Sequence, residues 1–440
     1  MGLDSLGSSS YGPEAELTIL LPLGAWGMGY LGPVMAFVIA LLAVLYVSYR
    51  QTLAAYPTSG GAYAVARENL GEYPSLLAAA ALMIDYVLNV AVGISSGVGV
   101  LVSAMPSLHP YIQPLCFGIV AIITIANLRG TGEAGWLFAL PIYLFIVCFL
   151  GSVGYGLIRI VAEGNPRPIV APPPLGPPET AAAGWLLMHA FASGCTAVTG
   201  VEAVSNVIGS FKEPIIRNAY ITLTIIVVVL GLLRGGIATI VTWFEIGAMD
   251  QTRDGYKSVL SQLLGAVVGH GVFYYIAMSS LLCILSLSAN TSFVGFPRIC
   301  RVVAADGYLP KAFAQPGRRL VFTAGILFLS GIAALLSISF GGITERLIPL
   351  FAIRAFFTFR VLQVGMVAHW RRQPQKHPAK LLTNAVGAAS TGVALIVILT
   401  AKFTEGALIT LIAIPVTIIL LKAIKGYYTS LEHELPTPVR

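Results

Sequence analysis

A run of small and hydroxyl residues around one acid, Glu202, interrupts an apolar stretch from about residue 181 to 211. Residues 193–206 read SGCTAVTGVEAVSN, whereas an ordinary membrane helix there would be Leu, Ile and Val throughout. Small residues with a buried acid at membrane depth predict a helix that unwinds in mid-span and turns free backbone groups toward a polar cavity. The chemistry expected of such a place is the binding of an ion or small substrate.

The same signature occurs near the N-terminus, where residues 8–15 read SSSYGPEA and Asp4 precedes them. Both stretches contain the pattern Gly-x-Glu-Ala, which puts Glu14 and Glu202 at matching positions. Two matching interrupted helices in two halves of a membrane protein point to a transporter's binding site. We therefore expect the first and sixth spans to be broken, each with its glutamate one turn beyond the break.

A second set of oxygen-bearing residues lies in the predicted third span, where Asp85 and Asn89 share one face of a helix. The carboxylates of Asp4 and Asp85, the amide oxygen of Asn89 and the hydroxyl of Thr199 are suitable ligands for a hard, weakly held cation. The alternative for Asp85 is a buried hydrogen bond that packs helices. For Thr199 it is a hydroxyl bonded back to its own helix.

Other ionisable residues in the predicted spans need a reason, because charge at membrane depth is costly. A buried carboxyl group can hold a proton, which makes Glu202 and Glu14 candidates for a proton relay. Alternatively they hold half-helices by bonding to freed backbone donors, which we favour for Glu14 and leave open for Glu202. Arg234 could extend toward the interface or face a cavity. The sequence assigns no role to Arg354 and Arg360.

The composition excludes a soluble protein, since 57% of the residues are hydrophobic, only 10% are charged and the mean hydropathy is +0.84. The net charge of +7 need not indicate nucleic acid, because cytoplasmic loops collect Lys and Arg. The cysteines lack CxxC spacing, and no Walker loop or HExxH motif occurs. We expect a multi-pass protein of the cell membrane, with the bilayer as partner, no cofactor and no enzymatic activity.

The apolar runs predict about twelve spans, of which the first and sixth are irregular. Only about ten apolar residues follow Pro13, or half a hydrocarbon core, so we expect a truncated first span and a chain whose true start lies further upstream. The predicted spans are 12–24, 30–49, 75–104, 111–127, 135–160, 182–211, 219–243, 268–299, 320–339, 344–368, 381–402 and 406–425.

With the N-terminus inside, the cytoplasmic loops and tail hold seventeen Lys and Arg residues and the outer loops six, which predicts cytoplasmic N- and C-termini. Spans one to five and six to ten form two equal sets that each open with a broken helix, the layout of an inverted-repeat transporter. The expected divisions are 1–161 for repeat one, 162–181 for an external Pro-rich linker, 182–370 for repeat two, and 371–440 for two further spans and a short tail.

Several longer stretches carry a family resemblance. The motifs PTSGGAY at 57–63 and RVVAADGYLP at 301–310 resemble the amino acid–polyamine–organocation (APC) superfamily. Within it, the chain is similar to the KimA-type potassium importers, which are related to the Kup transporters. The residues that support this are Asp4 with Tyr11, DYVLNVAV at 85–92, residues 193–206, FKEP at 211–214 and ANTSF at 289–293.

The resemblance implies an all-α LeuT-like fold with a five-plus-five inverted repeat plus two extra helices, proton-coupled potassium uptake, and a homodimer. It also implies that Asp4, Tyr11, Asp85 and Thr199 stand at the places of potassium ligands. Asn89 stands where relatives carry a threonine ligand. For Tyr11, the alternative is an interfacial tyrosine.

Two other functions remain open from the sequence. The commoner activity of the superfamily is amino-acid or amine transport, in which a substrate carboxylate meets bare backbone donors at a helix break. The paired negative charges of Asp4 and Asp85 would repel a carboxylate and attract a cation, which favours potassium. The short first span and the arginines at 354 and 360 also suggest an N-terminally incomplete, inactive chain.

Overall fold

The computed structural model describes residues 3–57, 60–130, 135–179, 184–315 and 322–434, and within these ranges it contains helices and loops but no strand. This confirms the all-α prediction. Ten helices in the described part are long and apolar enough to cross a membrane. They are α2 (Ala25–Ala55), α4 (Glu72–Ala104), α5 (Ile112–Arg129), α6 (Gly135–Glu163), α9 (Ile215–Trp243), α11 (Val272–Ala305), α12 (Thr323–Phe340), α13 (Thr344–Arg372), α14 (Pro378–Lys402) and α15 (Leu408–Glu434).

Every predicted span corresponds to one of these helices, to α1 (Leu3–Leu20), or to the interrupted segment that begins with α7 (Gly184–Gly194). The predicted boundaries at 182–183 and 320–321 lie outside the described residues. Two helices were not predicted, α3 (Gly61–Asn69) and α10 (Val259–Val268). Both are too short to span a bilayer, so a search for long apolar runs passes over them.

The expected break in the first span is wrong, because α1 is one continuous helix through residues 8–15. The hydroxyls of Ser8, Ser9 and Ser10 each donate to the carbonyl three residues earlier, at 2.6 to 2.7 Å. Hydroxyls that bond back in this way satisfy themselves inside a regular helix. Pro13 is also accommodated within α1.

The break in the sixth span is confirmed and lies within the predicted stretch 193–206. After α7 the chain forms a 3₁₀ turn, Cys195–Val198, and then unwinds before the four-residue α8 (Ala203–Asn206). Thr199 is extended, and Gly200 has a positive φ of 91°. A Cβ atom on Gly200 would lie 2.6 Å from the backbone nitrogen of Ser5 in α1, so only glycine fits this approach.

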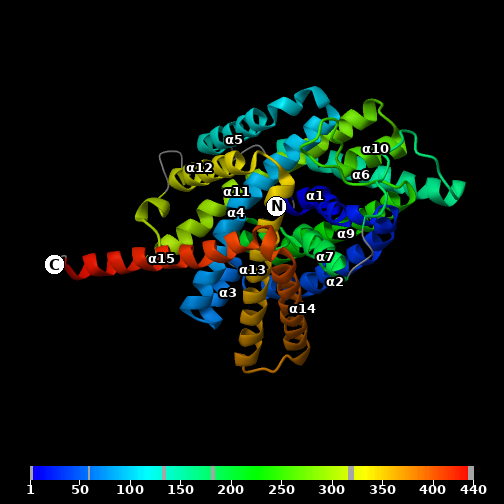
Figure 1. The fold of residues 1–440 in the computed structure, drawn as a ribbon. Helices are drawn as coiled ribbons and strands as arrows, with labels where there is room; N and C mark the ends of the chain where they lie inside the picture. The colour runs from blue at the N-terminus through cyan, green and yellow to red at the C-terminus, as the bar shows by residue number, and fades with distance from the viewer. Residues whose placement is uncertain (1–2, 58–59, 131–134, 180–183, 316–321, 435–440) are drawn as a thin grey trace.

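The middle of the bundle is formed by α4, which packs against α11 and α13, while α1 packs against α7, α9 and α11 (Figure 1). In the most apolar 18-residue window of α4, 89% of the residues are buried. The corresponding share for α15, which extends away from the bundle in Figure 1, is 17%. The helix with Asp85 and Asn89 therefore passes through the centre, and α15 lies at the periphery.

Candidate functional site

The candidate site lies where the first half of α1 meets the unwound segment after α7. The hydroxyl of Ser8 donates to the carbonyl of Ala197 at 3.2 Å, and Gly200 approaches the backbone at Ser5. These contacts hold Asp4, at the start of α1, beside the unwound segment. Two parts of the chain nearly two hundred residues apart thus form one buried polar region.

Asp4 and Asn89 meet at α11. Asp4 is buried, and its Oδ1 accepts a hydrogen bond from the hydroxyl of Ser288 at 3.3 Å. The amide nitrogen of Asn89 donates to the hydroxyl of Ser292 at 2.9 Å and to the carbonyl of Ser288 at 3.4 Å. Because the amide nitrogen faces α11, only the oxygen of Asn89 is left to serve as a cation ligand.

Asp85 forms a buried ion pair with Arg354, which α13 contributes. The guanidinium also lies 3.8 Å from the centre of the Phe351 ring. Asp85 thus lies in the predicted region, but its carboxylate is already paired with the guanidinium of Arg354. Sequence reasoning noticed Arg354 without finding its partner; the available signal was that a charge inside a span requires an opposite charge.

Thr199 and Glu202 both bond to the unwound backbone. The Thr199 hydroxyl donates to the carbonyl of Thr196 at 2.7 Å, and a hydroxyl that donates keeps its oxygen lone pairs for a cation. The Glu202 carboxylate accepts the backbone N–H of Gly200 at 2.9 Å. Glu202 thus has the bonding role that the sequence left open, as an acceptor for a freed backbone donor.

Four charged groups share this region. The guanidinium of Arg354 interacts electrostatically with Asp85, Asp4 and Glu202, and Glu202 interacts with both aspartates. Tyr11 is buried beside them, where its ring meets Phe351 edge-on at 6.1 Å between centroids. One guanidinium therefore shares this buried region with three acidic side chains, of which Asp85 contacts it directly.

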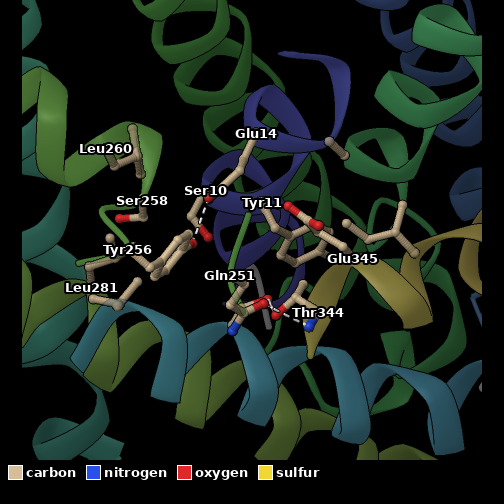
Figure 2. A pocket seen from close by; sticks show the side chains of 14 residues that line it. Ser10, Tyr11, Glu14, Gln251, Tyr256, Ser258, Leu260, Leu281, Thr344 and Glu345 are labelled. Atoms are coloured by element: carbon tan, nitrogen blue, oxygen red, sulfur yellow. Dashed lines mark hydrogen bonds between the residues drawn. The ribbon is translucent and has the colours of Figure 1, made fainter. Parts of the chain in front are cut away.

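Glu14 does not occupy a place equivalent to that of Glu202, which corrects the expectation. Its carboxylate accepts a hydrogen bond from Tyr256 at 2.6 Å and lines a separate small pocket, which we call the outer pocket (Figure 2). Glu345, from the first turn of α13, reaches into the same pocket. Tyr11 lines this pocket and interacts electrostatically with Asp4, so it lies between the outer pocket and the candidate site.

A second cavity, of about 380 Å³, lies beside the first half of α4 and is called the inner cavity. It is lined by Tyr86 of α4, Asn206 of α8, and Arg298 and Arg301 of α11. The outer pocket, in contrast, is lined by Ser96 and Val100 from the far end of α4. The two cavities thus lie toward opposite ends of the same central helix.

A further α1 carboxylate, Glu16, which the sequence did not single out, packs against the end of α7. A Cβ atom on Gly194 would overlap the Glu16 carboxylate, and Glu16 forms a buried ion pair with Arg234 of α9. Arg234 is thus paired inside the protein and does not extend to the interface. Arg360 lies against α14, where a Cβ atom on Gly392 would come within 2.8 Å of its Nη1.

Ten potential spanning helices around a buried group of carboxylates define a multi-pass membrane protein with an internal polar site. The chain belongs to the amino acid permease family, whose family model matches residues 8–421. This assignment confirms the superfamily predicted from the motifs, and it makes the protein a transporter and not an enzyme.

Similarity to individual proteins is also extensive. The chain is 39% identical to the potassium transporter KimA of Bacillus subtilis over 433 residues, which are 98% of this chain and 70% of KimA. It is 33% identical to a probable Kup potassium transport protein of Nitrosospira multiformis over 140 residues, 31% of this chain and 21% of that protein. A low affinity Kup protein of Yersinia pestis (strain Pestoides F) is 32% identical over 145 residues, 32% of this chain and 22% of that protein.

Proposed function

We propose that this protein takes up potassium together with protons, through the buried region formed by α1, the unwound segment, α4 and α13. The observation that carries the proposal is the excess of acid, with Asp4, Asp85 and Glu202 around one guanidinium. Extensive similarity to a potassium transporter supports it. The proposed fold is the LeuT-like five-plus-five inverted repeat with two added helices and cytoplasmic termini; homodimerisation is proposed from the family resemblance.

A charge count gives the coupling. If all three carboxylates are ionised, the single guanidinium leaves two negative charges without a counter-charge. Uncompensated charge in a low-dielectric interior costs several kcal/mol, so the region is expected to acquire positive charge from solution. One potassium ion and one proton would supply it. A site with this balance favours loading both cations together.

The oxygens suit a potassium ion. Its ligands would be the carboxylates of Asp4 and Asp85, the amide oxygen of Asn89 and the hydroxyl oxygens of Thr199 and Tyr11, all hard donors. All five come from α1, α4 and the unwound segment, and α1 is held to the unwound segment by the Ser8–Ala197 hydrogen bond and the close approach of Gly200 to Ser5. Movement of α1 against α4 would therefore assemble or dismantle the ion's shell.

The proposed proton carrier is Glu202. Its carboxylate accepts the N–H of Gly200, and a charged acceptor makes a stronger hydrogen bond than a neutral one. Protonation would weaken this bond and loosen the unwound segment beside Thr199. Proton binding would then act on the backbone that also carries an ion ligand. Glu14 is assigned to the outer pocket and remains only a candidate for delivering protons.

One contact argues against an amino-acid substrate. Carriers of amino acids bind the substrate carboxylate with free backbone donors at the helix break. Here the Gly200 N–H is already taken by the carboxylate of Glu202, which would also repel the substrate. A cationic amine remains the second candidate, since it shares the positive charge that the acidic region favours.

Rubidium uptake in a bacterium without its own potassium importers tests the proposal. The chain is expressed as given and, in case it is incomplete, with any recovered upstream sequence. We expect uptake that Asp85→Asn abolishes and that the exposed-loop control Asp250→Asn leaves intact. Uptake of a labelled amine in place of rubidium would select the second candidate. No uptake of either ion by membrane-localised protein would refute the proposed function.

A further inference from the structure

The guanidinium of Arg354 stands where a transported cation would bind. It forms an ion pair with Asp85, one of the two aspartates proposed to hold the ion. It also interacts electrostatically with Asp4 and Glu202. We infer that Arg354 is a resident counter-cation, which binds Asp85 when potassium is absent and is displaced from it when potassium enters. The inference rests on the proposed function and identifies the residue that sets the affinity of the site.

Few contacts hold the guanidinium of Arg354. Its only hydrogen bond in the described part of the chain is from Nη1 to Asp85, while Nε and Nη2 are buried without a partner. Arg234 in the Glu16 pair has the same bonding pattern among the described residues, so what distinguishes Arg354 is the two further carboxyl groups, Asp4 and Glu202, that interact with it. Arg354 is held by one carboxylate and by the face of the Phe351 ring. Release therefore breaks few contacts.

Potassium and the guanidinium cannot share Asp85 at no cost. Both are monovalent cations, and two like charges a few ångströms apart repel strongly in a low-dielectric interior. The arginine side chain has several rotatable bonds, so its head can leave Asp85 and remain near the carboxylates of Asp4 and Glu202. Binding of the ion and movement of Arg354 are thus one exchange, and α13 senses whether the site is filled.

This exchange has two measurable consequences. A competing internal cation weakens the binding of potassium, so that the ion can also leave. It also supplies a positive charge to Asp85 after the ion has left, which lowers the cost of returning the empty carrier. Removal of the charge should therefore tighten ion binding and slow turnover at the same time, whereas loss of a merely structural arginine would not tighten binding.

The kinetic test uses Arg354→Gln, Arg354→Lys and a control, Arg360→Gln, on the same helix. We expect Arg354→Gln to lower the KM for rubidium about tenfold and to lower the maximal rate. Arg354→Lys, which retains the charge, and Arg360→Gln should keep the KM of the unmodified protein. An unchanged or raised KM in membrane-localised Arg354→Gln would overturn the inference while leaving potassium uptake established.

A second test does not depend on uptake. The purified Arg354→Ala variant has space for a free guanidinium ion beside Asp85, so about 10 mM guanidinium should raise its Tm by a few degrees. The unmodified protein and an Arg354→Ala/Asp85→Asn variant should show no such rise. If guanidinium stabilises Arg354→Ala but the unmodified protein takes up no rubidium, the proposed function is refuted, while the inference that the Arg354 guanidinium occupies a cation-binding position beside Asp85 is supported. If guanidinium does not stabilise Arg354→Ala, that inference is contradicted.

Discussion

Two buried ion pairs in this protein look alike and differ in their surroundings. Glu16 pairs with Arg234 between α1 and α9, and Asp85 pairs with Arg354 between α4 and α13. Each joins a carboxylate to an arginine far away in the sequence, and all four side chains are buried. Around the first pair, the charges of one acid and one base cancel. Around the second pair, Asp4 and Glu202 add negative charge.

We propose that this difference separates a structural ion pair from a cation-binding site. A balanced buried pair holds two helices in place and has nothing to gain from solution. A pair with two extra ionised carboxylates nearby would attract cations, because the protein would not compensate its own charge. The same chemical group, an arginine on a carboxylate, can therefore be structural in one place and part of a transport cycle in another. The charged groups around each arginine–carboxylate pair, more than the residue types in it, are what distinguish the two pairs.

The largest expected effect is on uptake. Asp4→Asn and Asp85→Asn should each reduce rubidium uptake to background, because each removes an ion ligand's charge, while the amount of protein in the membrane stays normal. Uptake per membrane-localised protein measures this. Full transport by either variant would show that the residue is not needed in the ion site. It would also weaken the proposal that extra acidic groups distinguish the Asp85–Arg354 pair from the Glu16–Arg234 pair.

The next effect is on stability. Glu16→Gln or Arg234→Met alone should destabilise the protein by about 3–5 kcal/mol, because each leaves its partner charged and unpaired in the interior. The double variant should recover part of this loss, since no buried charge remains. Thermal unfolding of the purified proteins measures the cycle. If the double variant regained stability but lost all uptake, the pair would be part of the transport machinery and the comparison would fail.

A third change concerns the proton. Glu202→Gln should flatten the pH profile of rubidium uptake, measured between about pH 5 and 8, because a neutral amide cannot exchange the coupled proton. Glu14→Gln is the comparison variant, since Glu14 lies in the outer pocket and is the other candidate for handling protons. An unchanged profile in Glu202→Gln, with a flattened one in Glu14→Gln, would transfer the proton role to the outer pocket.

The smallest expected effect is at the outer pocket. Glu345→Gln removes one of two carboxylates there and should raise the KM for rubidium about two- to threefold without changing the maximal rate, because the pocket then concentrates fewer cations. High salt should reduce the difference between the two proteins. A change in the maximal rate at unchanged KM would place Glu345 in the moving parts instead.

The sequence predicted the helices better than the contacts. Apolar runs identified the spans, and the small residues before Glu202 identified the true break. The serines of α1 gave a wrong prediction, because hydroxyl groups can be satisfied within a helix and need no cavity. Glu14 and Glu16 are two positions apart, about 200° around the helix, so matching motifs selected the residue on the wrong face. Two positions along α1 therefore separate an acid in the outer pocket from an acid paired with Arg234.

Pairings across the fold could not be predicted. Arg354 and Asp85 are separated by 269 positions, and Arg234 and Glu16 by 218. Burial cost requires a partner for each arginine, but it does not say which of several acids supplies it. That choice depends on which faces of α1, α4, α9 and α13 meet. Single-sequence reasoning has no access to these packing angles.

The outer pocket and the inner cavity differ in the charged side chains that line them. Glu14 and Glu345 line the first, whereas Arg298 and Arg301 line the second, at opposite ends of the central helix. A mobile cation is enriched near acids and depleted near bases, whatever its concentration in bulk. A cation would therefore meet carboxyl groups toward one end of the central helix and guanidinium groups toward the other.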